Sequence, residues 1–404
     1  MSQSAITTPV TGWSHTVFAY AFRPFFLAVA CYAVVVTGYW SLGITGWLPL
    51  SFGSALIAWH VHELVFGVAT AALAGFLLTA VPEWTEVAPL TGRRLKPLFL
   101  LWLLARVAAW LLPLLGPLPM ALLNLLFVSL IFMTVAPGLW RGAQGRHRVF
   151  AYLIFALWIV QVLIYAHWFA DNLQQVRLLL FVVLGIFLLL ILAALGRISM
   201  VIVNEALQRQ GVLDERFIAR PPRRRYTMGI LALFLLVDYL MPYSSVSGWI
   251  ALATAAALLN ILNDWHLPGV WRDFYVRVLY TVYLALVAGF ALIGMDYLWH
   301  IFPGNYARHI LTVGALGLSI MAVLTIAGLR HTGRTLEYHP LIKWSFRLIL
   351  LAMIARVAPP LQGAGSIQPI GYGVSALLWC GGFTLYLVHF WRKLTSPRVD
   401  GLPG

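Results

Sequence analysis

Runs of about twenty apolar residues recur along the whole sequence, and this feature limits the chain to one class of fold. A helix of that length spans the hydrocarbon of a bilayer with all of its backbone hydrogen bonds satisfied internally. Only 10% of the 404 residues are charged and 61% are hydrophobic, whereas a soluble domain carries about 25% charged residues. The sequence therefore predicts an all-α polytopic membrane protein whose single transmembrane domain, 1–404, lies in a lipid bilayer.

Twelve apolar spans can be distinguished, and the connections between them are too short for a separate soluble domain. They cover roughly residues 17–39, 54–82, 97–113, 119–139, 149–169, 176–203, 226–242, 247–265, 275–295, 308–329, 341–358 and 370–391. We expect each of them to be a transmembrane helix.

Basic residues are concentrated in alternate loops. They follow the even-numbered spans, and the longest connection, 208–225, ends in three consecutive arginines. Loops after odd-numbered spans carry one basic residue or none. Because cytoplasmic loops of membrane proteins are enriched in lysine and arginine, we expect both termini to face the cytoplasm. These loops also account for the net charge of +14, so nucleic acid is excluded as a partner, since no soluble basic domain could carry it.

One stretch of the second span, Trp59-His60-Val61-His62-Glu63, carries three ionisable side chains within a long apolar run. Such groups are costly in hydrocarbon and mark a metal, a cofactor or a polar partner. His60 and His62 are two residues apart, which is about 200° around a helix, so they face different directions. The sequence leaves open which of the two faces a cofactor, and a polar clasp between helices is the alternative.

The second and tenth spans share a short pattern, in which a histidine is followed by leucine two residues later and glycine five residues later. The pattern covers 62–67 and 309–314. Thr-Gly-Arg follows both spans, and Ala-Arg-Val-Ala lies in the span after each of them. Three matches in the same order suggest a duplicated unit, although apolar sequence is degenerate and chance similarity stays open. Duplication would place His62 and His309 at equal depth on two helices.

Two imidazoles at equal depth on different helices are the arrangement that clamps a haem iron. We therefore predict a haem, of b type, with His62 and His309 as axial ligands and Trp59 beside it. Candidate cations for the haem propionates are Arg106, Arg308 and Arg356. The glycines Gly67, Gly75 and Gly314 would let a flat ring or another helix approach.

A second metal is the role predicted for the histidine that does not face the haem. His60 and Glu63 are candidates to hold copper or to relay protons, and they are the predicted catalytic pair. Metal ligation is predicted for His60, His62, His309 and His331. Imidazole suits iron, copper and zinc alike, so the residue type does not select the metal.

Two arginines near the inner ends of their spans also need an explanation. Arg23 lies near the inner end of the first span, where it either reaches the lipid headgroups or has a buried partner. Arg197 lies deeper and follows Gly196, so we expect a buried partner such as Glu205 or an anionic ligand. Asp238 is expected to pair with an arginine from another helix.

These segments together resemble the NnrS family over nearly the whole chain. The resemblance rests on Phe22-Arg23-Pro24-Phe25-Phe26, on 59–67, on 75–85 with Pro82-Glu83-Trp84, on Gly196-Arg197-Ile198, on 309–314 and on 331–334. It implies a twelve-helix, multi-pass protein of the bacterial inner membrane that carries haem and copper. It also implies a link to denitrification and to defence against nitric oxide and nitrosative stress.

Two positions depart from the family's pattern. The ninth span has no histidine where the family commonly has one, and Glu83 stands where the family has asparagine. The layout also resembles, more distantly, the catalytic subunit I of haem-copper oxidases and nitric oxide reductases, in which twelve helices form arcs of four. Spans six and seven contain no histidine, so a copy of the binuclear centre of those enzymes is not expected.

The functional hypothesis is a haem protein that binds nitric oxide, or that reduces it as a nitric oxide reductase-type oxidoreductase with electrons from quinol or another donor. The alternative belongs to another class: a transporter or scaffold without a redox cofactor, in which His60, His62 and Glu63 handle an ion or a proton.

Overall fold

The computed structural model describes residues 16–142, 145–267, 269–301, 303–358 and 368–402. Helix is the only regular structure in these ranges. The first half contains α2 (Phe22–Ile44), α3 (Leu56–His62), η2 (Glu63–Ala69), α4 (Thr70–Thr85), α5 (Gly92–Trp110), α6 (Leu112–Leu115), α7 (Pro117–Arg141), α8 (Arg148–Phe169) and α9 (Leu173–Arg209). The second half contains α10 (Pro221–Leu240), α11 (Ser245–Leu262), α12 (Phe274–Trp299), α13 (Gly304–His309), η6 (Ile310–Leu316), α14 (Gly317–His331), α15 (Pro340–Val357) and α16 (Gln368–Thr395). Short 3₁₀ turns complete the connections, at Gly53–Ala55, Gly145–His147, Asn263–Trp265 and Val270–Arg272.

Helices occupy all twelve of the ranges expected to be spans, and two of them are composite rods: α3-η2-α4 and α13-η6-α14. Within the described residues, nine helices are long and apolar enough to cross a membrane. The chain is therefore an all-α polytopic membrane protein, as predicted. The other three rods, α5, α10 and α15, contain several charged residues each, so their crossing of the bilayer stays a prediction.

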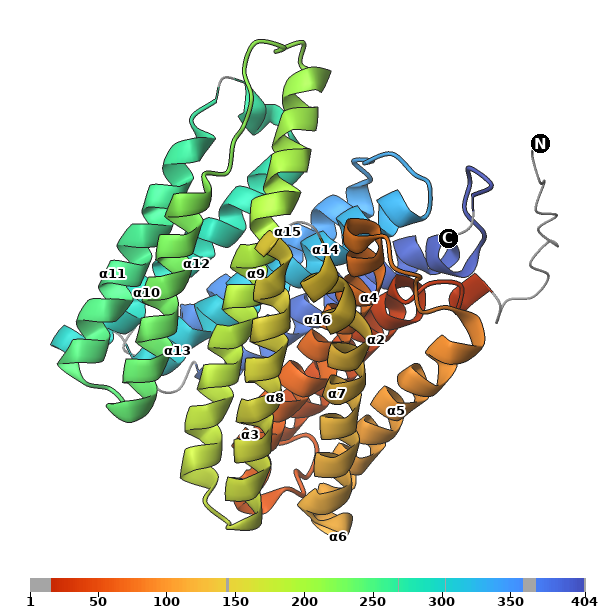
Figure 1. Ribbon diagram of the computed structural model, residues 1–404. Helices are drawn as coiled ribbons and strands as arrows, with labels where there is room; N and C mark the ends of the chain where they lie inside the picture. Colours follow the sequence, from red (N-terminus) through yellow and green to blue (C-terminus); the bar gives the residue numbers. More distant parts are fainter. Residues whose placement is uncertain (1–15, 143–144, 268, 302, 359–367, 403–404) are drawn as a thin grey trace.

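The rods pack as three successive units of four helices. The units are α2-α4-α5-α7, α8-α9-α10-α11 and α12-α14-α15-α16. The last helix of each unit packs against the first helix of the next, in the pairs α7 with α8, α11 with α12, and α16 with α2. The second rod of each unit lies toward the centre, where α9 contacts α3 and η6, and α14 contacts α4. Figure 1 shows α10 and α11 on one side and α5 on the other. This layout agrees with the three arcs expected from the sequence.

Both composite rods contain a π-helical segment at the same position of the repeated pattern. The segment η2 begins directly after His62, η6 begins directly after His309, and each is seven residues long. In the described parts of the chain, π-helix occurs in these two places only. Such segments are rare and are frequent at functional sites. The shared backbone feature favours duplication over chance as the origin of the repeat.

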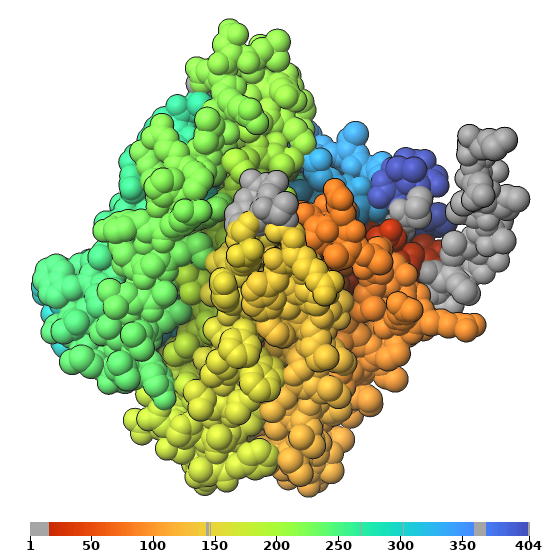
Figure 2. Space-filling model, viewed as in Figure 1, coloured from red at the N-terminus to blue at the C-terminus, as the bar shows by residue number. Residues whose placement is uncertain are grey.

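The connection between α9 and α10 projects beyond the bundle at one end (Figures 1 and 2). Ion pairs tie the units together near this end. Arg330 of α14 binds both carboxylate oxygens of Glu205 of α9 at 2.5 Å. Arg209 of α9 bonds Asp273, the residue before α12, at 2.6 Å. The second unit is thereby attached to the third at the arginine-rich end.

The C-terminal end of α16 is held by two side chains from other segments. Arg23 is fully buried, and its Nη1 donates to the carbonyl oxygens of Leu394 at 2.8 Å and Ser396 at 2.7 Å. Glu337, in the loop before α15, bonds Lys393 Nζ and His389 Nε2 at 2.7 Å each. Arg23 therefore has a buried backbone partner and does not reach for headgroups.

We expect Arg23→Met to lower the free energy of unfolding by about 2–3 kcal/mol, because two charge-assisted hydrogen bonds to carbonyls are lost. The measurement is the melting temperature in detergent. Arg93→Met, which removes an exposed arginine, is the control and should leave the melting temperature unchanged. Equal melting temperatures for the two variants would contradict the role given to Arg23.

Glu337 predicts an acid-sensitive contact. Burial raises the pKa of this carboxyl, but the bonds from Lys393 and His389 outweigh burial and hold the pKa below its usual value. A lowered folded-state pKa contributes stability above the unfolded value, about 4.3, and that stability is lost as pH falls through the folded pKa. We expect the melting temperature to fall below about pH 4, and to fall less in Glu337→Gln.

The control for this pH series is Glu215→Gln, which removes an exposed carboxylate from the connection after α9. It should reproduce the wild-type pH profile. Overlapping profiles for wild type and Glu337→Gln between pH 6 and 3.5 would show that this contact does not titrate as described.

Candidate functional site

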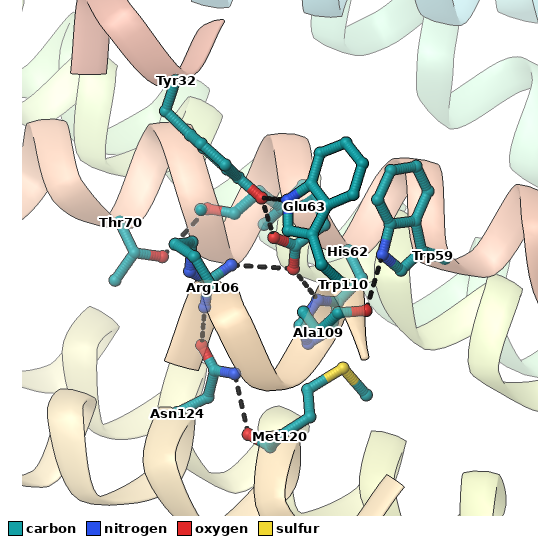
Figure 3. Close-up of polar contacts among 12 residues, drawn as sticks. Tyr32, Trp59, His62, Glu63, Thr70, Arg106, Ala109, Trp110, Met120 and Asn124 are labelled. Atoms are coloured by element: carbon teal, nitrogen blue, oxygen red, sulfur yellow. Dashed lines mark hydrogen bonds and ion pairs between the residues drawn. The ribbon is translucent and has the colours of Figure 1, made fainter. Parts of the chain in front are cut away.

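The side chain of Glu63 is fully buried at the start of η2 and is surrounded by donors from three helices (Figure 3). Its Oε1 receives His62 Nδ1 at 2.8 Å and Arg106 Nη1 at 2.7 Å. Its Oε2 receives the hydroxyl of Tyr32. A carboxylate in an apolar interior is stable only when it is paired and hydrogen-bonded in this way. The four side chains therefore form one hydrogen-bonded network.

The network around Glu63 extends through Arg106 and Tyr32. Arg106 Nη2 donates to the amide oxygen of Asn124, and the Trp110 indole donates to the Tyr32 hydroxyl at 3.0 Å. A Cβ added at Gly67 would lie 2.5 Å from the Tyr32 ring and 3.0 Å from Arg106. The space beside Gly67 thus admits these two side chains, and the flat ring expected there from the sequence is not needed to explain the glycine.

Both ring nitrogens of His62 have protein partners. Nδ1 bonds Glu63, and Nε2 lies 2.9 Å from the hydroxyl of Tyr165 in α8. Because Nδ1 donates its hydrogen to the carboxylate of Glu63, Nε2 carries the lone pair and accepts a hydrogen bond from the Tyr165 hydroxyl. In this arrangement neither nitrogen of His62 is left for a metal. The imidazole that we expected to be an axial ligand belongs to the hydrogen-bonded network instead.

His60 faces away from this network, as the helical spacing predicts. Its ring stacks on Trp40 with centroids 3.9 Å apart and an interplanar angle of 17°. Its Nδ1 is buried and has no hydrogen-bond partner among the described residues. An electrostatic interaction links His60 to His309 and Arg356, and none with His309 is found for His62. We infer from this difference that His309 lies on the His60 side of the second rod, whereas the sequence suggested His62.

His309 is oriented by its own helix, because Nδ1 donates to the carbonyl oxygen of Asn305 at 2.7 Å. That bond fixes the tautomer in which Nε2 carries the free lone pair. Arg356 completes the group, with its guanidinium 4.0 Å from the centroid of the Tyr372 ring. We call His60, His309 and Arg356 the histidine cluster. His60 comes from the first unit of helices, and the other two come from the third.

The other arginines expected near propionates have carboxylate partners. Arg106 binds Glu63, and Arg308 lies 3.2 Å from Asp238 and 2.5 Å from the Tyr297 hydroxyl. The expectation that Asp238 pairs with an arginine from another helix is confirmed. Of the three candidate cations, only Arg356 lies in the histidine cluster.

Three further predicted site residues have local partners. Trp59 is buried, and its indole donates to the carbonyl oxygen of Ala109 at 2.9 Å. His331 lies 3.1 Å from Glu83. Trp84 stacks on His147 with centroids 5.0 Å apart. None of these three belongs to the histidine cluster.

Glu205, the partner that the sequence suggested for Arg197, binds Arg330. The Arg197 guanidinium lies over Trp84 at 4.2 Å from the ring centroid. Among the described residues there is no group of three or more histidine, cysteine, aspartate or glutamate side chains that could hold a metal ion. The histidine cluster therefore offers two imidazoles.

Tyr32, Tyr165 and Asn124 were not identified from the sequence. Asn124 is a polar residue inside an apolar span, and that signal could have identified it. The tyrosines carried no such signal, because tyrosine is common in membrane helices at the interface.

The family model described as NnrS protein matches residues 16–398, which is nearly the whole chain. No curated protein matches the chain significantly.

We expect Glu63→Gln to lower the free energy of unfolding by about 3–5 kcal/mol, because the Arg106 charge stays buried without its counter-charge. The double variant Glu63→Gln with Arg106→Met should lose less than the sum of the two single variants. Thermal unfolding in detergent measures all three, with Glu215→Gln as the control at an exposed carboxylate. Strict additivity would rule out a coupled pair.

Proposed function

The chain belongs to the NnrS family of nitric-oxide-response membrane proteins, and we propose that it carries a haem held by His60 and His309. We place it in the bacterial inner membrane with both termini in the cytoplasm, which the alternation of arginine-rich loops supports. The proposal keeps the haem expected from the sequence and replaces His62 by His60 as the ligand of the second span.

The residues present fit such a group in their donor chemistry. The observation that carries the proposal is the buried Nδ1 of His60, which has no described partner and lies near His309. A buried polar atom without a partner is costly, and a metal ion would satisfy it. Arg356 supplies a positive charge beside the pair, as the carboxylates of a haem require.

The surrounding side chains orient the two imidazoles. Stacking on Trp40 holds the ring plane of His60, and the bond from His309 Nδ1 to Asn305 directs Nε2 away from its own helix. Such outer contacts set the tautomer and the orientation of a ligand histidine. Held by both imidazoles, a haem would supply an electron-transfer or sensing iron, and it would take up nitric oxide only where one of the two imidazoles is displaced.

The network around Glu63 has a different part in the proposal. It fixes the start of η2 and thereby the direction of His60, three residues before Glu63. If nitric oxide is reduced with quinol electrons, His60 and Glu63 are the residues that we propose for the relay of protons. Copper at His60 remains an alternative metal, because imidazole suits it equally.

A non-redox role in ion or proton transport is the second candidate. One observation favours it: His62 and Glu63 are satisfied entirely by protein groups, so this part of the predicted site needs no metal. A preparation without haem and without metal from haem-replete cells would support that function.

We expect the purified protein to contain haem, measured by the pyridine haemochrome assay together with metal analysis. His60→Ala and His309→Ala should each lose most of it, because one imidazole holds the group less tightly than two. His62→Ala should retain haem as long as it folds, and His266→Ala, at an exposed position, is the control.

Optical spectra with and without nitric oxide then distinguish a protein that binds the gas from one that reduces it. A spectrum that shifts on addition of the gas supports binding, and consumption of the gas with quinol supports reduction. Equal haem content in all four variants would contradict the ligand assignment.

A further inference from the structure

A small cavity between α8, α9 and α10 has a basic lining. Its polar side chains are His147, Arg197, Arg224 and Arg225, and its volume is about 90 Å³. The remaining described lining residues are apolar, and no carboxylate is among them. A cavity of this size has room for a group of several heavy atoms.

Arg197 is held in a fixed position at this cavity. Its Nη1 lies 2.9 Å from Nε2 of His147, and its guanidinium covers the Trp84 ring at 4.2 Å. Trp84 in turn stacks on His147 with an interplanar angle of 21°. The aromatic rings thus fix the orientation of the guanidinium plane, and with it the direction of its N–H groups.

Arg224 reaches the same place across Gly196. A Cβ added at Gly196 would lie 2.0 Å from Arg224 Nη1. The glycine therefore admits the guanidinium of α10 to the surface of α9, directly beside the residue that carries the second guanidinium. Two arginines from neighbouring helices converge because this one position lacks a side chain.

Two further arginines near the start of α10, Arg220 and Arg223, bind one carboxylate outside the cavity. Arg223 Nη1 bonds Asp264 at 2.7 Å, and Arg220 Nε lies 3.6 Å from the same carboxylate. That carboxylate does not line the cavity. Positive charges brought together repel, and an anion placed between them removes the repulsion.

We propose that this cavity binds a phosphate group, supplied either by an anionic phospholipid headgroup or by a small soluble phosphate. Guanidinium forks match phosphate oxygens in a bidentate way. Basic pockets between transmembrane helices are suited to lipid headgroups. The site is independent of the histidine cluster and of the function proposed above.

The test uses the full-length protein, purified in detergent and stripped of lipid. Binding is measured as the rise in melting temperature when phosphatidylglycerol or inorganic phosphate is added. Phosphatidylcholine, whose phosphate is balanced by its own ammonium group, is the zwitterionic control. Native mass spectrometry counts the lipid that stays bound. Wild type should bind one of the two phosphate sources in preference to phosphatidylcholine.

Arg224→Gln and Arg197→Gln should each weaken that binding about tenfold, the effect of one lost charge-assisted hydrogen bond. Gly196→Ala keeps every charge but displaces the Arg224 guanidinium, so it should weaken binding similarly. Arg148→Gln removes an exposed arginine at the start of α8 and is the matched control, with unchanged binding.

Stabilisation by phosphatidylglycerol alone identifies a lipid site, and stabilisation by inorganic phosphate identifies a soluble ligand; either supports the proposal when the variants lose it. Folding of each variant is checked by its melting temperature without ligand. The proposal is overturned if folded Arg224→Gln and Gly196→Ala bind like wild type, or if phosphatidylcholine stabilises the protein as strongly as the phosphate sources.

Discussion

A carboxylate in the apolar interior of a membrane bundle has to be surrounded by donors, and Glu63 meets this requirement with Tyr32, His62 and Arg106. These donors come from α2, α3 and α5, so one side chain connects three rods of the first unit. Removing Arg106 would leave the buried charge of Glu63 without its counter-charge, and removing Tyr32 or His62 would leave a carboxylate oxygen short of a donor. The position of the second rod, and of everything that it presents to the third unit, depends on this interaction.

The consequence for function is that His60 and His62, two residues apart, have different roles. His62 is held on both nitrogens by the network, whereas His60 points to the other side with a buried nitrogen that lacks a described partner. The third unit brings His309 toward His60, at the matching position of a rod with the same π-helical segment. The repeat thus builds two related rods, one carrying a fixed polar network and the other an imidazole directed at the interface between the units.

Much of the fold could be predicted from the sequence, because hydrocarbon allows few solutions and apolar length determines the rods. The direction of the rods, which arginine in alternate loops indicates, stays a prediction. The opposite directions of His60 and His62 followed from helical spacing alone. The choice between them could not be made, since it depends on Tyr165 and Arg106, which reach His62 and Glu63 from rods far away in sequence. Of the two partners expected for Arg197, Glu205 binds Arg330 instead, because apolar helices give no signal about which neighbour lies opposite.

The central claim is that His60, and not His62, lies opposite His309. It can be tested directly by cysteine cross-linking in a variant whose natural Cys31 and Cys380 are replaced by serine. The cysteine pair introduced by His60→Cys and His309→Cys should be joined by a short bifunctional thiol reagent, and the pair from His62→Cys and His309→Cys should not. Efficient cross-linking of the second pair, with none of the first, would contradict the account.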